Sequence, residues 1–200
     1  MPVPSRASMT AALAAFERLP LPAGDHRPAA VAVAVVEVGD GLGVLLTRRA
    51  AGLRAHAGQW ALPGGRTDPG ESAVAAALRE TDEELGLPVH PDDVLGLLDD
   101  YPTRSGYVIT PVVLWAGRTE ELRPNPDEVA SVHVVPLVEL DVEPRFLTIP
   151  ESASPVIQLP LMGTLVHAPT AAVLHQFREV ALHGRATRVT GYEQPVFAWR

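Results

Sequence analysis

The chain has 200 residues, a formal net charge of −8 and an apolar content of 46%, which suits one soluble domain with its own hydrophobic core. It contains no cysteine, and all 16 basic residues are arginine, so disulfides, thiolate chemistry, cysteine metal sites, Schiff bases and P-loop lysines are excluded. The acidic balance argues against a protein that coats nucleic acid, which normally presents a basic face.

Residues 1–27 are expected to form an N-terminal extension with one short helix. Ser8 or Thr10 can cap its start, because a hydroxyl oxygen accepts a hydrogen bond from a first-turn amide. The helix is expected to run to about Leu19, where prolines follow. The simplest interpretation is a helix that packs at the edge of the domain.

Neither a membrane span nor a signal peptide is indicated. The longest apolar run, 29–36, is far too short to cross a bilayer. Glu17 and Arg18 interrupt the N-terminal apolar stretch that a signal peptide needs. A cytoplasmic location, without a membrane partner, is therefore the expectation.

The Val-rich segment 29–38 and the segment 42–48 predict two strands. The Gly-Asp-Gly turn between them indicates a hairpin. A long loop, 49–62, follows, and loops of this length are usually functional or disordered. It carries side chains able to hold a phosphate and a flat or polar group: Arg49, Arg54, His56, Gln59 and Trp60. A plainer interpretation makes the arginines solvated charges and His56 a structural histidine.

The next segment places an acidic helix after the Pro63-Gly64-Gly65 turn. Glu80, Glu83 and Glu84 have the spacing i, i+3, i+4, so a helix puts all three carboxylates on one face. Their mutual repulsion is offset most simply by a bound cation, and oxygen ligands suit Mg²⁺ or Mn²⁺. A solvated acidic helix face is the alternative interpretation.

Three further strands are predicted at 94–99, 107–115 and 129–135. Pro111 within the second of these predicts an edge strand or a bulge, because proline has no amide to donate. A polar loop precedes the third strand and offers more carboxylates, of which Glu128 is best placed at the strand's start.

The C-terminal part is rich in proline and is expected to contain short extended pieces at 145–149 and 155–159. The segment 170–183 predicts an amphipathic helix. Its inward side chains are expected to be Val173, Leu174, Phe177, Val180 and Ala181. The tail, 184–200, could add a strand or a dimer contact through Val196, Phe197 and Trp199.

The stretch 65–87 resembles the Nudix box. The matching positions are Gly65, Glu71, Arg79, Glu80, Glu83, Glu84, Gly86 and Leu87. The one departure is Thr81, where the family prefers an aliphatic residue. The resemblance implies an α/β/α sandwich with a mixed β-sheet and one Nudix hydrolase domain over 1–200. The core would be 28–140, followed by strands, a helix and a tail in 141–200.

The same resemblance implies metal-dependent hydrolysis of a pyrophosphate linked to a nucleoside. It makes Glu80, Glu83 and Glu84 the ligands of Mg²⁺ or Mn²⁺, with a Gly64 or Gly65 carbonyl nearby. In the family's box, Glu71 and Arg79 form an ion pair that orients the loop, and Gly86 ends the helix. Either Glu83 or Glu128 would activate the water.

A second resemblance covers 45–65 and is similar to the extra motif of the coenzyme A pyrophosphatases within the Nudix superfamily. The matching residues are Leu45, Leu46, Thr47, Arg49, Ala50, Arg54, His56, Gly58, Pro63, Gly64 and Gly65. Leu62 departs from it, since a Phe is usual there. The resemblance implies coenzyme A as substrate, 4′-phosphopantetheine and adenosine 3′,5′-bisphosphate as products, and Arg49, Arg54, His56 and Gly64 as substrate-binding residues.

Two other functions stay open at this point. One is a Nudix hydrolase of another substrate, such as ADP-ribose or a dinucleotide. The other is a non-catalytic nucleotide-binding module, against which the complete carboxylate set counts. The superfamily resemblance implies a homodimer, whereas the sequence itself leaves the oligomeric state, the metal and the general base undetermined.

Overall fold

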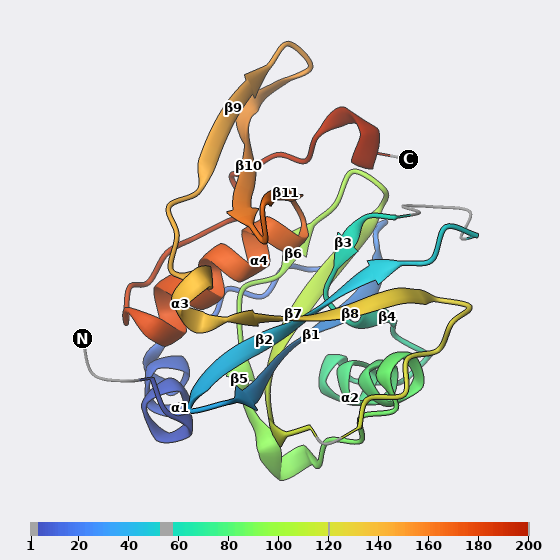
Figure 1. Ribbon diagram of the computed structural model, residues 1–200. Coiled ribbons are helices and arrows are strands. Elements are labelled where there is room, and N and C mark those ends of the chain that lie inside the picture. The colour runs from blue at the N-terminus through green and yellow to red at the C-terminus, as the bar shows by residue number, and fades with distance from the viewer. Residues whose placement is uncertain (1–3, 53–57, 120, 200) are drawn as a thin grey trace.

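The computed structural model describes residues 4–52, 58–119 and 121–199, and Figure 1 shows their arrangement. Within these residues the main sheet has eight strands in a mixed arrangement, with the order β3-β2-β1-β7-β5 along its path. The central strand β1 (Arg27–Val38) is antiparallel to β2 (Gly41–Arg49) and parallel to β7 (Tyr107–Arg118). The predicted hairpin and mixed sheet are confirmed.

The remaining strands of this sheet extend its edges. The pairings are antiparallel in each case: β3 with β2, β4 with β1, β5 and β6 with β7, and β8 with β2. Their bounds are Trp60–Ala61 for β3, Gly64–Arg66 for β4, Val94–Leu97 for β5, Tyr101–Pro102 for β6 and Val129–Pro136 for β8. Two short elements lie between strands, η1 (Pro91–Asp93) and α3 (Leu137–Leu140).

Helices cover both faces of the main sheet. Successive side chains of β1 point to opposite faces, and both sets are apolar, so each face needs a covering helix. Ala30 and Ala32 pack with α2 (Ala73–Leu85) on one face. Val33 and Val35 belong to a larger cluster on the other face, which includes residues of α1 (Arg6–Ala15) and α4 (Thr170–Phe177). Figure 1 shows α2 apart from α1 and α4, with the sheet between them. The expected α/β/α sandwich is confirmed.

The N-terminal helix starts earlier than predicted. Ser5 is its N-cap: the Ser8 amide donates to Ser5 Oγ at 3.2 Å, and the Ser5 amide donates to Ser8 Oγ at 2.9 Å. Ser8 therefore closes a reciprocal capping box rather than beginning the helix. Thr10 donates its hydroxyl to the Arg6 carbonyl inside the helix. The predicted caps and the predicted end at Leu19 were wrong.

Pro111 does not lie in an edge strand, and no register shift occurs at it. It pairs with Val31 inside β7, which has β1 on one side and β5 and β6 on the other. The partner on that second side changes from β5, at Val112, to β6, at Ile109. Proline is tolerated because it stands at the interval between these two partners, where a missing amide disrupts no ladder.

The C-terminal part forms a second antiparallel sheet and a buried helix. The strands are β9 (Arg145–Ile149), β10 (Ser152–Leu161) and β11 (Thr164–His167), and the β9–β10 hairpin projects from the body in Figure 1. Every residue of α4 is buried, as are the five side chains predicted to face inward. The helix is therefore not amphipathic, because both sheets and the tail enclose it.

The helix continues from α4 as a π-helix, η2 (Arg178–Leu182), and the tail forms a short 3₁₀ turn, η3 (Val196–Ala198). The tail adds one bridge, between Glu193 and Val156 of β10, rather than a full strand. Across residues 4–52, 58–119 and 121–199, no helix is long and apolar enough to cross a membrane.

Candidate active site

The box helix α2 ends at Gly86, as the sequence predicts, and the structure shows where it begins. Ser72 is its N-cap and accepts a hydrogen bond from the Ala75 amide at 3.1 Å. Gly86 closes it in the left-handed conformation, with φ of 61°, which glycine adopts without steric penalty. Thr81 fits the buried position because its hydroxyl donates to the Ala77 carbonyl at 2.6 Å. The helix therefore presents its acidic residues over its last two turns.

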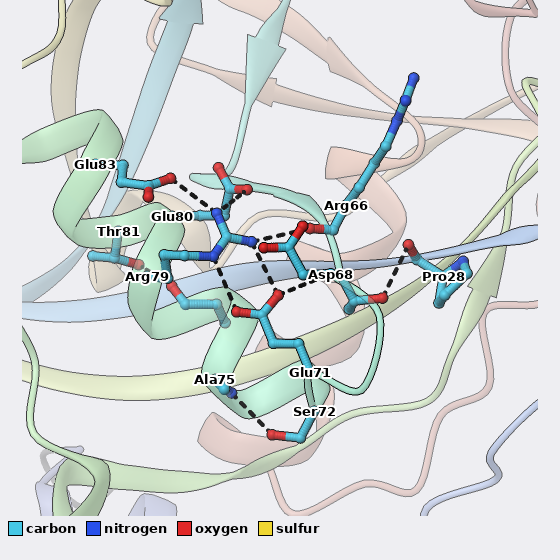
Figure 2. A network of polar contacts seen from close by, with 12 residues as sticks. Pro28, Arg66, Asp68, Glu71, Ser72, Ala75, Arg79, Glu80, Thr81 and Glu83 are labelled. Atoms are coloured by element: carbon cyan, nitrogen blue, oxygen red, sulfur yellow. Dashed lines mark hydrogen bonds and ion pairs between the residues drawn. The ribbon is translucent and has the colours of Figure 1, made fainter.

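Arg79 is the centre of a polar network on α2, which Figure 2 shows from close by. Its Nε and Nη2 donate to the two carboxylate oxygens of Glu71, each at 3.0 Å. Its Nη1 donates to Glu80 at 2.8 Å and to Glu83 at 2.9 Å. The hydrogen bonds from Arg79 lower the pKa of Glu71, and those with Glu71 raise the pKa of Arg79.

This network fixes the loop before α2 to the helix. Arg79 Nη2 also donates to the Arg66 carbonyl at 3.1 Å, and the Asp68 amide donates to Glu71 at 2.9 Å. The ion pair between Glu71 and Arg79 that the resemblance implied is thus present. Its two parallel hydrogen bonds define one orientation for the guanidinium.

Three carboxylates converge beside this network, and they come from two segments of the chain. One oxygen from each of Glu80, Glu84 and Glu128 lies within 4.8 Å of the other two. Glu83 is not in this group, since its side chain lies on Arg79 and is 58% exposed. The assignment of Glu83 as a metal ligand therefore stays a prediction, and Glu128 joins the carboxylates on α2.

Backbone contacts bring Glu128 to the helix. The Glu128 carbonyl accepts a hydrogen bond from the Ala50 amide at 2.8 Å. The loop before it binds the end of α2: the Arg123 amide donates to the Leu85 carbonyl at 2.7 Å, and the Asn125 amide to the Glu84 carbonyl at 2.9 Å. These carbonyls have no partner inside the helix, so the loop completes the helix end and positions Glu128. No local sequence signal indicated this loop contact.

The carboxylate group is electrostatically strained. Burial, together with the charge of the neighbouring Glu80, raises the pKa of Glu84 to about 8. Burial also raises the pKa of Glu80, against the effect of its hydrogen bond from Arg79. Buried carboxylates of this kind ionise more readily when a cation lies between them. The oxygen-only donor set therefore fits a hard divalent cation such as Mg²⁺ or Mn²⁺.

Arg49 and Gly64 approach Glu84 from outside the box helix. Both the charge of Arg49 and the Gly64 backbone amide act to lower the pKa of Glu84, against its burial. Arg49 Nε is buried without a hydrogen-bond partner among the described residues. Arg54 and His56, the other predicted substrate-binding residues of this loop, lie outside the described residues.

Comparison with known proteins identifies the family. The family described as NUDIX domain matches this chain over residues 26–158. The chain is 47% identical over 97 residues to a protein named uncharacterized Nudix hydrolase NudL from Photorhabdus laumondii, which covers 48% of this chain and 52% of the relative. It is 42% identical over 116 residues to NudL of Escherichia coli K12, covering 58% of this chain and 60% of the relative. The chain thus spans between half and two thirds of the length of these curated relatives.

Among solved structures, the crystal structure of RenU, a Nudix hydrolase from M. smegmatis, is similar in fold. The TM-score is 0.53 at 23% identity, and the match covers 79% of this chain and 87% of RenU. At this identity the likeness concerns the fold alone. Together with the family match and the box helix, it leads to one conclusion: the chain belongs to the Nudix hydrolase family.

Proposed function

We propose that this Nudix hydrolase cleaves the pyrophosphate of coenzyme A or its derivatives, giving 4′-phosphopantetheine and adenosine 3′,5′-bisphosphate. One observation carries this proposal. The segment 45–65, which resembles the extra motif of coenzyme A pyrophosphatases, contributes Arg49 beside the carboxylate group. The charge of that arginine acts on Glu84, and a guanidinium in this position is suited to hold a substrate phosphate by charge-assisted hydrogen bonds.

In this proposal Glu80 and Glu84 hold the divalent cation, with Glu83 or Glu128 as a further ligand. When bound, such a cation neutralises the phosphate oxygens and lowers the pKa of a nearby water. Arg79 orients Glu80 through the hydrogen bond at 2.8 Å, and Glu71 in turn orients Arg79. The Gly64 backbone lies close to Glu84. Any side chain at position 64 would collide with the Ala30 carbonyl of β1.

The reaction consumes one water. The water oxygen forms a bond to one phosphorus, the bridging P–O bond breaks, and the bridging oxygen leaves with the other phosphate group. A carboxylate takes the proton of the attacking water. Glu83 and Glu128 are the two candidates for this base, since both are exposed to solvent at the edge of the site. Glu128→Gln and Glu83→Gln, compared across pH, separate them: the base variant loses the acidic limb of the kcat/KM profile.

A substrate panel tests the proposal. The protein is incubated with Mg²⁺ or Mn²⁺ and with coenzyme A, dephospho-coenzyme A, ADP-ribose or a diadenosine polyphosphate, and the products are separated by chromatography. Coenzyme A should give the highest kcat/KM. A preference for ADP-ribose by tenfold or more would leave a general Nudix pyrophosphatase, and binding without turnover of any member would leave a nucleotide-binding module.

A further inference from the structure

A recess that none of the three carboxylates lines lies beside β3. Its volume is about 230 Å³. Three segments that are distant in sequence form its walls: Arg48 with Gln59 and Trp60 around β2 and β3, His167 at the end of β11, and Phe197 in η3. The Thr170 hydroxyl donates to the Trp60 carbonyl at 3.1 Å, which fixes the start of α4 to this wall.

The recess has flat aromatic walls and a polar edge. The Arg48 guanidinium lies 5.1 Å from the centre of the Trp60 ring, and its nitrogens donate to the Gly58 carbonyl. The rings of His167 and Phe197 meet edge to face with centroids 5.1 Å apart. Burial lowers the pKa of His167, so its neutral ring can both donate and accept a hydrogen bond. The Gln59 side chain adds an amide donor and acceptor.

We propose that this recess is the pocket for the nucleobase of the substrate. A purine needs flat surfaces for stacking and hydrogen-bonding groups at its edge, and the walls provide both. The volume is below the range of about 300–1,000 Å³ that holds a whole drug-sized ligand, so the pocket takes one ring system rather than a complete dinucleotide. Phosphates are held elsewhere, since Arg48 is already engaged by a carbonyl and by Trp60.

The pocket is within reach of the reacting pyrophosphate, and in this respect the inference rests on the proposed function. Trp60 and Gly64 are four residues apart, so their Cα atoms are separated by at most about 14 Å. The Arg49 amide donates to the Gln59 carbonyl at 3.0 Å, which holds the pocket wall against β2. Arg48 lines the pocket, and the charge of the next residue, Arg49, acts on Glu84, so adjacent residues at the end of β2 serve the pocket and the carboxylate site.

Binding of a base-containing probe tests the assignment directly. The affinity of AMP is compared with that of ribose 5-phosphate, which has the same phosphate and no base, by calorimetry on the intact chain. Phe197→Ala and His167→Ala should weaken AMP binding by roughly fivefold or more, with little change for ribose 5-phosphate. Phe197 is 57% exposed, so its truncation leaves the core intact, and thermal melting verifies this.

Phe146→Ala is the matched control, because Phe146 is 47% exposed on β9 and does not line the pocket. Equal AMP affinity in Phe197→Ala, His167→Ala and Phe146→Ala would overturn the inference. So would a loss of 4′-phosphopantetheine binding with AMP binding unchanged, since the pocket would then hold the other half of coenzyme A. If AMP binding depends on Phe197 but coenzyme A is not hydrolysed, the result supports the nucleobase pocket and contradicts coenzyme A as the substrate.

Discussion

Gly65 lies directly against the carboxylate of Glu80. A Cβ atom on Gly65 would lie 2.2 Å from Glu80 Oε1 and 2.5 Å from its Cδ, far inside van der Waals contact. Gly65 is held in place because it pairs with Ala30 of β1. A side chain at position 65 must therefore displace the Glu80 carboxylate, which explains in steric terms why the box begins with glycine.

Gly65→Ala should separate site geometry from stability. The displaced group is the end of a flexible side chain, so we expect only a small change in melting temperature. Activity should fall by at least about tenfold, which corresponds to about 1.4 kcal/mol of transition-state stabilisation. Gly191→Ala is the control, since a Cβ there meets nothing within 4 Å. Equal kcat/KM in the two variants would contradict the importance of the Glu80 position.

Glu84→Gln should abolish turnover and change the pH dependence of stability. Burial raises the pKa of Glu84 to about 8 from an ordinary value of 4.5, so the folded state holds a proton that the unfolded state has released. Without metal, the wild type should therefore lose stability as pH rises through this window, on the order of a few kcal/mol. Glutamine cannot ionise, so the variant lacks this loss.

The measurement is thermal unfolding between pH 5 and 8, with a chelator and with excess Mg²⁺. Asp82→Asn is the control, because Asp82 is exposed on the same helix and outside the carboxylate group. The metal should stabilise the wild type and Asp82→Asn, but not Glu84→Gln. Activity of Glu84→Gln within about threefold of the wild type, or equal stabilisation of the two by Mg²⁺, would rule out the metal assignment. Parallel pH curves without metal would contradict the raised pKa of Glu84.

Glu71→Gln should reduce both activity and stability, because Arg79 loses its two-point contact. The pKa of Glu71 is lowered by the hydrogen bond from Arg79, so its stabilising effect is present above the ordinary value of 4.5 and disappears as pH falls. The deficit in melting temperature should thus be largest near neutral pH. Glu139→Gln is the control, because Glu139 is an exposed glutamate on α3, outside the network around Arg79. Unchanged melting with lost metal affinity would instead make Glu71 a ligand.

The box helix was predictable because its information is local. Arg79 and Gly86 act on neighbours within one helix and its preceding loop, so the resemblance to the Nudix box is enough to assign them. The N-cap Ser72 was not assigned from the sequence. The sequence could also propose Glu128, since it stands at the start of a strand. It could not place this residue beside Glu80, because that contact depends on the pairing of Ala50 with Glu128 across the sheet.

The errors also have physical causes. Ser5 and Ser8 both suit an N-cap, and only the reciprocal hydrogen bonds distinguish them. The sequence pattern of α4 predicts one buried, apolar face. It does not show that neighbouring elements also bury the other face. From the sequence, Trp60 was expected only to belong to a loop able to hold a phosphate and a flat or polar group. The other walls of the recess beside it, His167 and Phe197, come from segments more than a hundred residues away.

The last prediction concerns Arg49 and the third phosphate of coenzyme A. Arg49→Ala should lower kcat/KM for coenzyme A by about ten- to a hundredfold, the value of a charge-assisted hydrogen bond of roughly 1.5–3 kcal/mol. Dephospho-coenzyme A lacks the 3′-phosphate. If Arg49 binds that phosphate, the variant should hydrolyse dephospho-coenzyme A almost as well as the wild type. The effect of the Arg49 charge on the pKa of Glu84 favours the other possibility, that Arg49 binds the pyrophosphate. In that case kcat/KM should fall for both substrates.

Arg49→Lys distinguishes geometry from charge, because lysine keeps the charge but cannot make a bidentate contact. It should therefore rescue only part of the loss. Arg118→Ala is the control, since this arginine is 81% exposed and pairs with Glu37 at the far end of β1. The measurement is chromatographic release of 4′-phosphopantetheine from both substrates. A wild-type kcat/KM in Arg49→Ala for both substrates would remove Arg49 from the substrate site, whereas equal losses would place it at the reacting pyrophosphate rather than in substrate selection.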